Sequence, residues 1–566
     1  MRTKSLEDEF PATELTRSAS SAENALSHDK SGSYDDPQWA PTINWGATWY
    51  ETGMTPRERK RRGHFSTPLQ LVKEIFDACG YTSQAGLMCV RVLDPACGSG
   101  NFLVEAAHRL LAWGKRVGLD QAAQATLLQH NLWGFDPDPV ACFLAQMHLY
   151  QPGETFTEIH IHQADALVLP WEPCVDIVVA NPPYLAAKNT DLSGYHSAQR
   201  KGQTDSYLLF LGLALQALRP GGWMGLVLPD PLLARANAAK ERRQLLEEAT
   251  VHHIWHLSGV FAADVGAVVI IAQKCPPKQL HQVSWVRGKW QNVLPAGHQI
   301  PQSLLHRQPG AEFRYFLNSA HGSIIERLRL QHEKPQAQQA AWPAMSRRLA
   351  PLSEFLRISR GEELGKNNPY ITKFVTQVPV SDNDNHSYPV LLGGIDIRPY
   401  TVPTAKYRIA GEAVAKPLER YLSAKLLVVK STDRLQAALD LQGHVALQTL
   451  YLLHSRTRDT SVDDLYFFLA LLNSRLLCEY VYMLHTAYKW VQPQIEQSVL
   501  ARLPIPLVEA NERSQIIQLS RLLVDACIGG DPVVEWKQDM YCLNEEQERA
   551  ICALYETVVP GLFVRA

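Results

Sequence analysis

Two apolar runs in the first half of the chain end in turns that a strand cannot continue through. The run Val175–Ala180 ends in Asn-Pro-Pro-Tyr, and the run Val90–Leu93 ends in the glycine-rich segment Asp94–Gly100. Short apolar runs bounded by proline or glycine are typical of buried strands. Each turn is therefore predicted to lie at the carboxyl end of a strand, which is where parallel α/β sheets place their binding sites.

Strand and helix patterns alternate from about residue 63 to residue 275, and this alternation sets the fold class. Helical periodicity predicts helices at Asn101–Val117 and Ser206–Leu218, between predicted strands. Alternating β and α units favour a largely parallel sheet with helices on both faces. We therefore expect an α/β, doubly wound, Rossmann-like sheet. The predicted strands are Val90–Leu93, Asn131–Phe135, Ile159–His162, Val175–Ala180, Trp223–Leu228 and Val268–Ala272.

Changes of composition divide the chain into five segments. Residues 1–44 are polar and lack periodicity, so we expect a disordered leader. The alternating pattern predicts a sheet domain at residues 45–280, and a Gln-, His- and Pro-rich stretch predicts a connector at residues 281–349. Shorter, mixed segments predict an α+β domain at residues 350–530, followed by a helical tail at residues 531–566.

The composition argues against several classes of protein. The 566 residues carry a net charge of −2, so nucleic-acid binding would have to use local basic patches. The ten cysteines include no Cys-x-x-Cys pair, which argues against a metal site and a disulfide framework. Because the sequence shows no apolar run of membrane-spanning length and no signal pattern, we expect a cytoplasmic protein that binds neither a membrane nor a metal.

Acidic side chains at three successive strand ends predict a nucleotide-cofactor site. Asp94 ends the first predicted strand, and the glycines after it let the backbone approach a ligand closely. Asp136 ends the next strand and can accept from both hydroxyls of a ribose, while Asp165 can accept from an adenine amino group. One such acid would only cap a helix or a turn, but three in succession favour a site. The acids predicted to contact the cofactor there are Asp94, Asp136 and Asp165.

The Asn-Pro-Pro-Tyr turn predicts chemistry at an amino nitrogen. An exocyclic amine on an aromatic ring is a weak nucleophile because its lone pair is delocalised. The side-chain oxygen of Asn181 and the carbonyl of Pro182 can accept from both N–H groups and restore the lone pair, while Pro183 stiffens the turn. Tyr184 offers a face on which a planar base can stack. Together with the acid-tipped strands, this turn predicts methyl transfer from S-adenosylmethionine (SAM) to an amino group.

Phe261 is the candidate for a second aromatic wall of this pocket. A base inside duplex DNA reaches such a pocket only when it is flipped out, which costs a few kcal/mol. A second ring that stacks on the base would offset this cost. Phe261 precedes the last predicted strand of the sheet, and its other interpretation is an ordinary core phenylalanine.

At these residues the chain resembles the gamma-class, amino-group N6-adenine DNA methyltransferases of type II restriction–modification systems, of the TaqI kind. The resemblance extends from about residue 63 to the end. It implies that Thr67 contacts the methionine part of SAM, that Phe210 packs on the cofactor adenine and that Phe261 stacks on the target base. The SAM-contacting residues that it implies at the strand ends are Asp94, Pro95, Ala96, Gly98, Asp136, Pro137, Asp165 and Ala166. Pro137 stands where an aliphatic residue is usual in this family, and Ala166 where a bulkier apolar residue can occur.

The resemblance also implies that residues 350–530 are a target-recognition domain that reads double-stranded DNA. Base contacts there would set the target, and phosphate contacts would position the protein. A separate cognate restriction endonuclease, or other defence-system subunits, are the implied protein partners. The matching segments are Gly63–Pro68, Ser359–Lys366, Gly393–Ile395, Asn473–Leu476 and Leu503–Pro506. The basic or aromatic residues that could reach DNA are Arg57, Arg59, Lys60, Arg61, Arg62, Arg360, Lys366, Arg398, Lys430, Arg434, Lys489 and Trp490.

Three other functions are compatible with parts of the sequence. Protein glutamine N5-methyltransferases also use Asn-Pro-Pro-Tyr, on a side-chain amide, but they resemble a compact domain with a small helical partner. N4-cytosine DNA methyltransferases are chemically close but more often carry Ser-Pro-Pro-Tyr. A scaffold or specificity subunit would retain the fold without needing the catalytic residues. The long C-terminal region and the intact motifs favour N6-adenine methylation of DNA.

Overall fold

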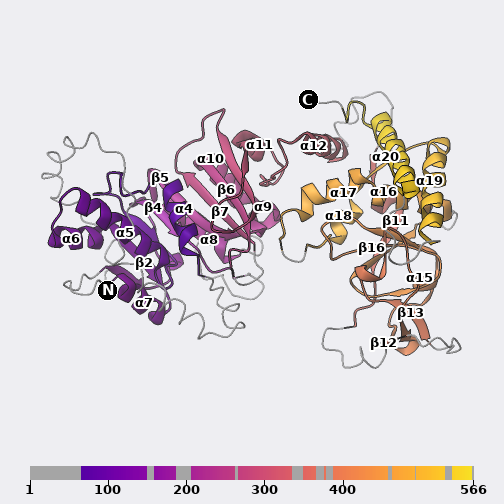
Figure 1. Ribbon diagram of the computed structural model, residues 1–566, viewed down its shortest axis with the longest axis horizontal. Helices are drawn as coiled ribbons and strands as arrows, with labels where there is room; N and C mark the ends of the chain where they lie inside the picture. The colour runs from indigo at the N-terminus through magenta and orange to yellow at the C-terminus, as the bar shows by residue number, and fades with distance from the viewer. Residues whose placement is uncertain are drawn as a thin grey trace. The chain divides into compact units, whose positions relative to one another are not determined.

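The computed structural model divides into two compact units, Met1–Tyr315 and Phe316–Ala566, each with its own hydrophobic core (Figure 1). Three predicted features lie outside the described residues: the leader at residues 1–44, the basic residues at positions 57–62, and Lys366. The structure describes residues 66–149, 159–185, 205–261, 266–333, 349–364, 375–377, 387–456, 462–490, 493–528 and 538–563.

Among the described residues, the first unit contains one nine-stranded sheet in the order β3-β2-β1-β4-β5-β7-β6-β8-β9. Strands β1 to β5 run parallel to one another, whereas β7 is antiparallel to both β5 and β6. The predicted α/β fold with a largely parallel sheet is therefore confirmed. The strands are β1 (Val92–Asp94), β2 (Leu132–Asp136), β3 (His160–Gln163), β4 (Val175–Ala180), β5 (Leu218–Pro229), β6 (Thr250–Ser258), β7 (Ala267–Gln273), β8 (Gln282–Lys289) and β9 (Gly297–Pro301).

The helices of the first unit bury their apolar sides against this sheet. In α5, Leu103, Ala106 and Leu110 are fully buried and recur at the spacing of one helix face. Helix α6 begins after Asp120, whose side chain accepts from the N–H of Ala123 at 2.8 Å and so caps the helix. The helices are α4 (Leu69–Ala78), α5 (Asn101–Arg116), α6 (Gln121–Asn131), α7 (Pro139–Leu149), α8 (Ser206–Ala217), α9 (Pro231–Ala234), α10 (Ala239–Glu248) and α11 (Gln302–His306).

The strand order reverses between β1 and β4, which are neighbours in the sheet although β2 and β3 separate them in sequence. Their register pairs Val92 with Ile177 and Leu93 with Val178, so both strands end at the same edge. In open α/β sheets the crevice at such a reversal holds the ligand. The glycine-rich turn after β1 thus lies beside the Asn-Pro-Pro-Tyr turn after β4. The loop at residues 82–88 precedes β1 and so lies at the opposite edge.

The first part of the expected connector, residues 281–315, extends the sheet. Strand β8 pairs in parallel with β6, and Val286 lies opposite Trp255. Val283 and Trp285 of β8 are fully buried and alternate with more exposed residues, which is the period of a strand that is covered on one side. Gln, His and Pro residues around this short pattern hide it in the sequence.

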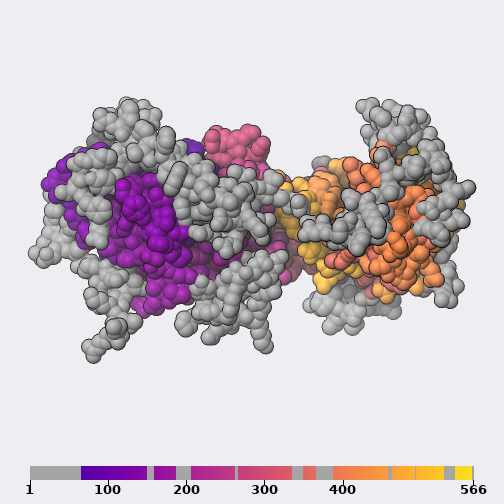
Figure 2. Space-filling view, turned by 90° about the horizontal axis from the view of Figure 1, so that it is seen from below, coloured from indigo at the N-terminus to yellow at the C-terminus, as the bar shows by residue number. Residues whose placement is uncertain are grey.

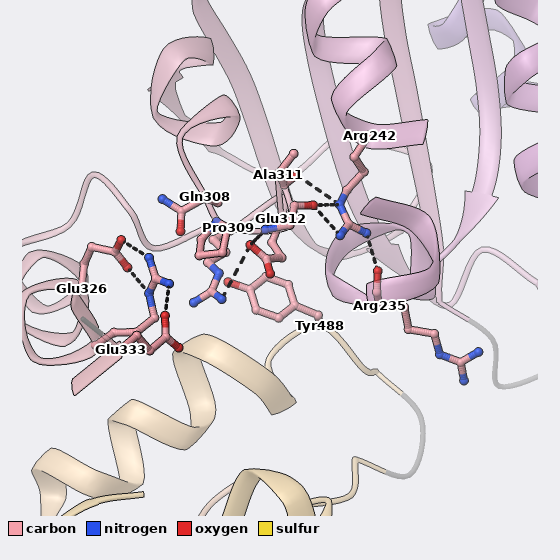
Figure 3. A network of polar contacts seen from close by, with 12 residues as sticks. Arg235, Arg242, Gln308, Pro309, Ala311, Glu312, Glu326, Glu333 and Tyr488 are labelled. Carbon is pink, nitrogen blue, oxygen red and sulfur yellow. Dashed lines mark hydrogen bonds and ion pairs between the residues drawn. The ribbon is translucent and has the colours of Figure 1, made fainter. Parts of the chain in front are cut away.

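Arg242 of α10 fixes the segment that follows β9 (Figure 3). Its side chain is fully buried and donates to the carbonyls of Gly310 and Ala311 at 2.8 to 3.2 Å. It also donates to the carbonyls of Leu232 and Arg235, at 2.8 and 2.9 Å. Burial lowers the pKa of Arg242 to about 10, so the guanidinium is still charged at neutral pH. One charged donor that serves four carbonyls holds this segment against α10.

α7 exposes apolar side chains on one face. Val140, Phe143 and Met147 follow helical spacing and are 49%, 59% and 46% exposed. In Figure 2 the purple residues, the colour of this part of the chain, form part of the visible face of the first unit. Ala141 and Ala145 are buried where the helix packs on α5, β2 and β3. α7 therefore approaches the sheet through small residues, which allows close contact.

The second unit combines small sheets with helices. Among its described residues, one sheet has the order β11-β19-β16-β17-β14, another has the order β12-β15-β13-β18, and β10 pairs with β20. Helix α20, which includes most of the expected tail, packs along α19, and the hydroxyl of Tyr555 donates to the carbonyl of Pro504 at 2.7 Å. The tail therefore shares the core of this unit.

The bounds of the second unit's elements are as follows. The strands are β10 (Leu349–Pro351), β11 (Leu356–Arg360), β12 (Val375–Gln377), β13 (Ser387–Leu391), β14 (Tyr400–Thr401), β15 (Tyr407–Ala410), β16 (Lys425–Val429), β17 (Ala437–Asp440), β18 (Val445–Ala446), β19 (Leu450–Ser455) and β20 (Pro504–Pro506). The helices are α12 (Ala320–Glu333), α15 (Glu419–Leu422), α16 (Val462–Asn473), α17 (Arg475–Val481), α18 (Gln497–Ala501), α19 (Ala510–Ile528) and α20 (Gln538–Val558).

Within the part of the chain that the structure describes, no single helix is long and apolar enough to cross a membrane. The bent pair Val462–Asn473 and Arg475–Thr486, broken by 59°, reaches that length and composition only when the two helices are taken together. Most of the apolar side chains of this pair are buried in the core of the second unit.

Candidate active site

Three acidic side chains meet at the carboxyl ends of β1, β2 and β3, which are neighbours in the sheet. Asp94 ends β1 and is 1% exposed, and Asp136 ends β2. Asp165 follows β3 and caps a short 3-10 turn by accepting from the N–H of Leu167 at 3.0 Å. The charge of Asp136 acts on Asp94, and the charge of Asp165 acts on Asp136. The structure thus brings together the three acids that the sequence predicts for one site.

Burial makes the carboxyl groups of Asp94 and Asp136 hard to ionise. It raises the pKa of Asp94 to about 8, although the N–H of Ala96 donates to Asp94 Oδ1 at 3.1 Å. Burial also raises the pKa of Asp136, against hydrogen bonds from the N–H groups of Asp138 and Gly98 at 2.8 and 3.0 Å. Such a group suits a ligand that brings positive charge and hydroxyl donors, because both favour the ionised carboxylate.

The turn after β1 lets the backbone approach a ligand. Gly98 and Gly100 have φ angles of +53° and +93°, which favour glycine. A Cβ on Gly100 would lie 3.0 Å from the Cβ of Ala145 in α7, so the turn also packs tightly against that helix. Helix α5 begins at Asn101, and the N–H groups of its first turn have no acceptor within the helix. This helix N-terminus suits an anionic group of the ligand.

Thr67 lies beside the same helix N-terminus. The Nδ2 of Asn101 donates to the Oγ of Ser66 at 2.8 Å and to the carbonyl of Thr67 at 3.2 Å, which holds this segment against α5. Thr67 is 4% exposed, and its Oγ1 has no hydrogen-bond partner among the described residues. Because a buried hydroxyl is costly to leave unpaired, the position of Thr67 Oγ1 fits a group that bonds a ligand.

The Asn-Pro-Pro-Tyr turn is held by Ser206, a residue that the sequence reasoning missed. The Oγ of Ser206 donates to the carbonyl of Pro183 and accepts from the N–H of Leu185 at 2.9 Å. The N–H of Ser206 donates to the carbonyl of Leu185 at 3.0 Å. Asn181 and the buried Pro182 precede these contacts, directly after β4. The first residue of α8 therefore keeps the turn in one orientation.

Tyr184 and Phe261 form an aromatic pair beside this turn. Their ring centroids are 6.4 Å apart, and the ring planes meet at 72°. The hydroxyl of Tyr184 donates to the carbonyl of Val227 on β5 at 3.2 Å, and burial raises the pKa of this phenol. Phe261 is 8% exposed and packs in the core of the first unit, while residues 262–265 lie outside the described part. The structure thus brings the two predicted aromatic walls into contact.

The other predicted contacts surround Asp165. Ala166 is buried, whereas Pro137 is exposed. Phe210 is 5% exposed on α8, and α8 packs against the 3-10 turn that begins at Ala166. The helix that carries Phe210 therefore lies next to the residues predicted to hold the cofactor adenine.

The predicted DNA-contacting cations of the second unit differ in how far they are already engaged. Arg434 pairs with Glu479 and lies over an aromatic ring at 4.4 Å, so its own unit holds its guanidinium. Arg360 is exposed at the end of β11. Lys416 and Arg420 donate to the Arg360 carbonyl at 3.3 and 2.8 Å. Three cations thus gather at the end of β11, and we call Arg360, Lys416 and Arg420 the basic cluster.

Both units match known families. Residues 49–289 match the N-6 DNA Methylase family, and residues 389–505 match the TaqI-like C-terminal specificity domain. The first match contains the three acids, the Asn-Pro-Pro-Tyr turn and Phe261. The second lies within the second unit and contains Lys416 and Arg420 of the basic cluster.

Curated relatives match this chain over part of its length. The type II methyltransferase M.VspI of Vibrio sp. (strain 343) is 24% identical over 287 residues, which are 49% of this chain and 63% of that protein. A type II methyltransferase of Pseudomonas aeruginosa is 32% identical over 183 residues, which are 30% of this chain and 32% of that protein. The chain thus spans less than two thirds of the length of these relatives.

A solved structure shares the fold over most of the chain. The type IIL restriction–modification enzyme MmeI, in complex with DNA, matches with a TM-score of 0.56 and 14% identity, over 90% of this chain and 78% of that one. At this identity the similarity concerns the fold. The matches in sequence show that residues 49–289 form a domain of the N-6 DNA Methylase family and that residues 389–505 form a TaqI-like C-terminal specificity domain.

Proposed function

We propose that this chain transfers a methyl group from SAM to the N6 amino group of a flipped adenine at a specific site in double-stranded DNA. The observation that carries the proposal is the reversal of strand order between β1 and β4. It sets the acid-tipped cofactor edge beside the Asn-Pro-Pro-Tyr turn, so a methyl donor and an amine can meet there. The family of the first unit supports the same chemistry.

The residues at the cofactor edge fit SAM. Asp136 would accept from the ribose hydroxyls, Asp165 from the adenine amino group, and Thr67 Oγ1 would bond the methionine part. The positive charge of the cofactor favours the ionised form of Asp94, whose pKa burial raises to about 8. SAM supplies an electrophilic methyl group when bound. The chain's own part is to hold the ribose and the methionine so that this methyl group faces the Asn-Pro-Pro-Tyr turn.

The Asn-Pro-Pro-Tyr turn would make the target amine more nucleophilic. Asn181 Oδ1 and the Pro182 carbonyl would each accept from one N–H group of the target N6, which raises the electron density on the nitrogen. The N6 lone pair then forms the new N–C bond as the S–C bond breaks, and the extra proton leaves the nitrogen for water. Because Ser206 fixes the turn in advance, the acceptors need little reorganisation.

Tyr184 and Phe261 would hold the flipped base. A base in the duplex must leave the stack to reach the turn, and stacking on aromatic rings offsets that cost. The second unit would supply target recognition, since base-edge contacts carry discrimination. A cognate restriction endonuclease or defence-system subunit on a separate chain is the proposed protein partner. The glutamine and N4-cytosine alternatives are disfavoured, because the two matched domains are those of N6-adenine DNA methylation.

Asn181→Ala tests the chemistry. Loss of one preorganised acceptor is expected to lower the methylation rate by about 10²- to 10³-fold, while SAM affinity measured by calorimetry stays near that of the wild type. Modified-base sequencing of DNA treated with each protein gives the modified atom and the site. Wild-type turnover in the variant, or modification at an atom other than adenine N6 by the wild type, would contradict the proposal.

A further inference from the structure

The loop that carries Phe261 starts and ends at the catalytic edge of the sheet. It leaves β6 after Ser258 and returns to β7 at Ala267. Strand β5 runs parallel to β6, with β7 between them, so β5 ends at the same edge. Asp230 is the first residue after β5. Its carboxylate thus lies where both stems of the loop begin.

Asp230 contacts the first stem through His256. The Nε2 of His256 lies 3.1 Å from Oδ1 of Asp230, and their side chains are 0% and 12% exposed. Burial lowers the pKa of His256 despite this neighbour, so the imidazole is neutral at pH 7. A carboxylate only accepts, so the shared proton is on Nε2. The contact is therefore a buried hydrogen bond to a residue near the carboxyl end of β6.

Asp230 also lies against the second stem. A Cβ on Gly266 would be 2.2 Å from Oδ1 and 2.4 Å from Oδ2 of Asp230. No real Cβ fits at that distance, so the carboxylate occupies the place of a side chain at Gly266. Any larger residue there would push the carboxylate away from His256.

The same carboxylate is close to the aromatic pair. The hydroxyl of Tyr184 donates to the carbonyl of Val227 on β5, three residues before Asp230 in the chain. The charge of Asp230 also acts on this phenol. Tyr184 in turn contacts the ring of Phe261. One acidic residue thus touches both stems of the loop and borders the ring that packs on Phe261.

We propose that Asp230 is a positioning residue that holds both stems of the Phe261 loop and so sets the aromatic pair that receives the flipped adenine. This inference rests on the proposed function. Asp230 needs only to accept from His256 and to fill the space at Gly266; it exchanges no proton with the substrate. Its shape and its acceptor oxygen therefore matter more than its charge.

Four variants of the full chain test this role. Asp230→Ala removes the acceptor, Gly266→Ala displaces it, and Asp230→Asn keeps both its shape and an acceptor oxygen. Gly86→Ala is the matched control, because a Cβ on Gly86 meets nothing within 4 Å. The target site is first identified by modified-base sequencing with the wild type. An oligonucleotide with 2-aminopurine in place of the target adenine then reports base flipping by fluorescence.

Asp230→Ala and Gly266→Ala are expected to reduce the 2-aminopurine signal and to lower kcat by about tenfold or more, with SAM affinity within twofold of the wild type. Asp230→Asn should retain most of the 2-aminopurine signal and most of kcat. Gly86→Ala should behave as the wild type. Unchanged fluorescence and kcat in Asp230→Ala would overturn the inference while leaving the function in place. Equal loss in Asp230→Asn would overturn the geometric role. If the wild type methylates no adenine, the proposed function fails, and the inference fails with it.

Discussion

At the scale of single residues, the candidate site depends on three acids at the ends of neighbouring strands and on Ser206 and Asp230, which contact the loops beside them. Asp94, Asp136 and Asp165 each lie at the end of a predicted strand, so their common edge could be predicted from three strands in succession. Ser206 and Asp230 could not be found in this way. Their partners lie 21 to 26 residues away in the chain, and only the packed sheet brings them into contact.

Asp94 should give the first unit a distinctive pH dependence in the absence of SAM. Burial, reinforced by Asp136, raises its pKa to about 8 in the native state, against an ordinary value of 3.8. Between these values the native state holds a proton that the unfolded state has lost. The free energy of unfolding therefore falls as pH rises, by at most about 1.4 kcal/mol per pH unit from this group.

Asp94→Asn should remove this slope, because an amide does not titrate. The variant is expected to be more stable than the wild type at pH 8, while its affinity for SAM is weaker. Denaturant unfolding between pH 5 and pH 8.5, followed for both proteins, checks the slope. The same decline in both proteins would show that Asp94 is ionised in the native state.

At the scale of elements, strands bounded by clear turns were predicted well and strands with polar residues were missed. The predicted Val175–Ala180 has the same bounds as β4. β6 escaped prediction because its His252, His253 and His256 break the apolar pattern that a buried strand usually shows. In the second unit, α16 and α17 are separate helices because the chain breaks at Ser474, whose side chain caps α17.

A buried ion pair joins β16 and β17 in the second unit. Nζ of Lys425 lies 2.6 Å from Oδ2 of Asp440, and both side chains are 0% exposed. Burial alone would raise the pKa of Asp440, but the hydrogen bond from His444 and the charge of Lys425 bring it down to about 2. This contribution to stability is present above pH 4 and is lost as pH falls through 2.

Lys425→Ala would leave the Asp440 carboxylate buried without its cation, at an expected cost of about 3–5 kcal/mol. The matched control is Lys489→Ala, whose partner Glu496 is 3.6 Å away and mostly exposed. That exposed pair is expected to contribute less than about 1 kcal/mol. Urea unfolding of the two variants gives the comparison, and equal losses would contradict the role of burial.

The basic cluster at the end of β11 should act on DNA as a phosphate-binding element. Arg360→Ala is expected to weaken binding to any duplex and to lower the salt dependence of binding, log Kd against log salt, by about 1. Arg434→Ala is the control, since Glu479 already engages that guanidinium. Titration of specific and unrelated duplexes at several salt concentrations checks this. A loss confined to the specific duplex would make Arg360 a base-reading residue instead.

At the scale of the whole molecule, the two hydrophobic cores determine which residues must be exchanged together when one unit is replaced by that of a relative. The sequence suggested a target-recognition segment at residues 350–530, between a connector and a tail. Ile325 and Leu328 of α12 and Tyr555 of α20 are buried in the same core as that segment. Composition could not show that α12 and α20 belong to this core, because contacts between residues far apart in the chain leave no local pattern in the sequence.

Exchange of Phe316–Ala566 for the corresponding unit of a relative with another target should therefore move the methylated site and leave the modified atom at N6. Exchange of residues 350–507 alone would cut this core and should give a less stable chimera. Modified-base sequencing reports the site, and thermal unfolding reports stability. Methylation of the original site by the larger chimera would assign target recognition to the first unit.

The loop at residues 82–88 is suited to the insertion of a reporter, because of the direction in which the parallel strands run. Every residue assigned here to cofactor or base lies at or beyond the carboxyl ends of the strands, and this loop precedes β1 at the other edge. Gly86 is exposed, and a Cβ there would meet no atom within 4 Å. Exposed loop tips of this kind tolerate inserted sequence. A fluorescent reporter or an affinity peptide placed at Gly86 would therefore label the protein in DNA-binding experiments without entering the candidate site.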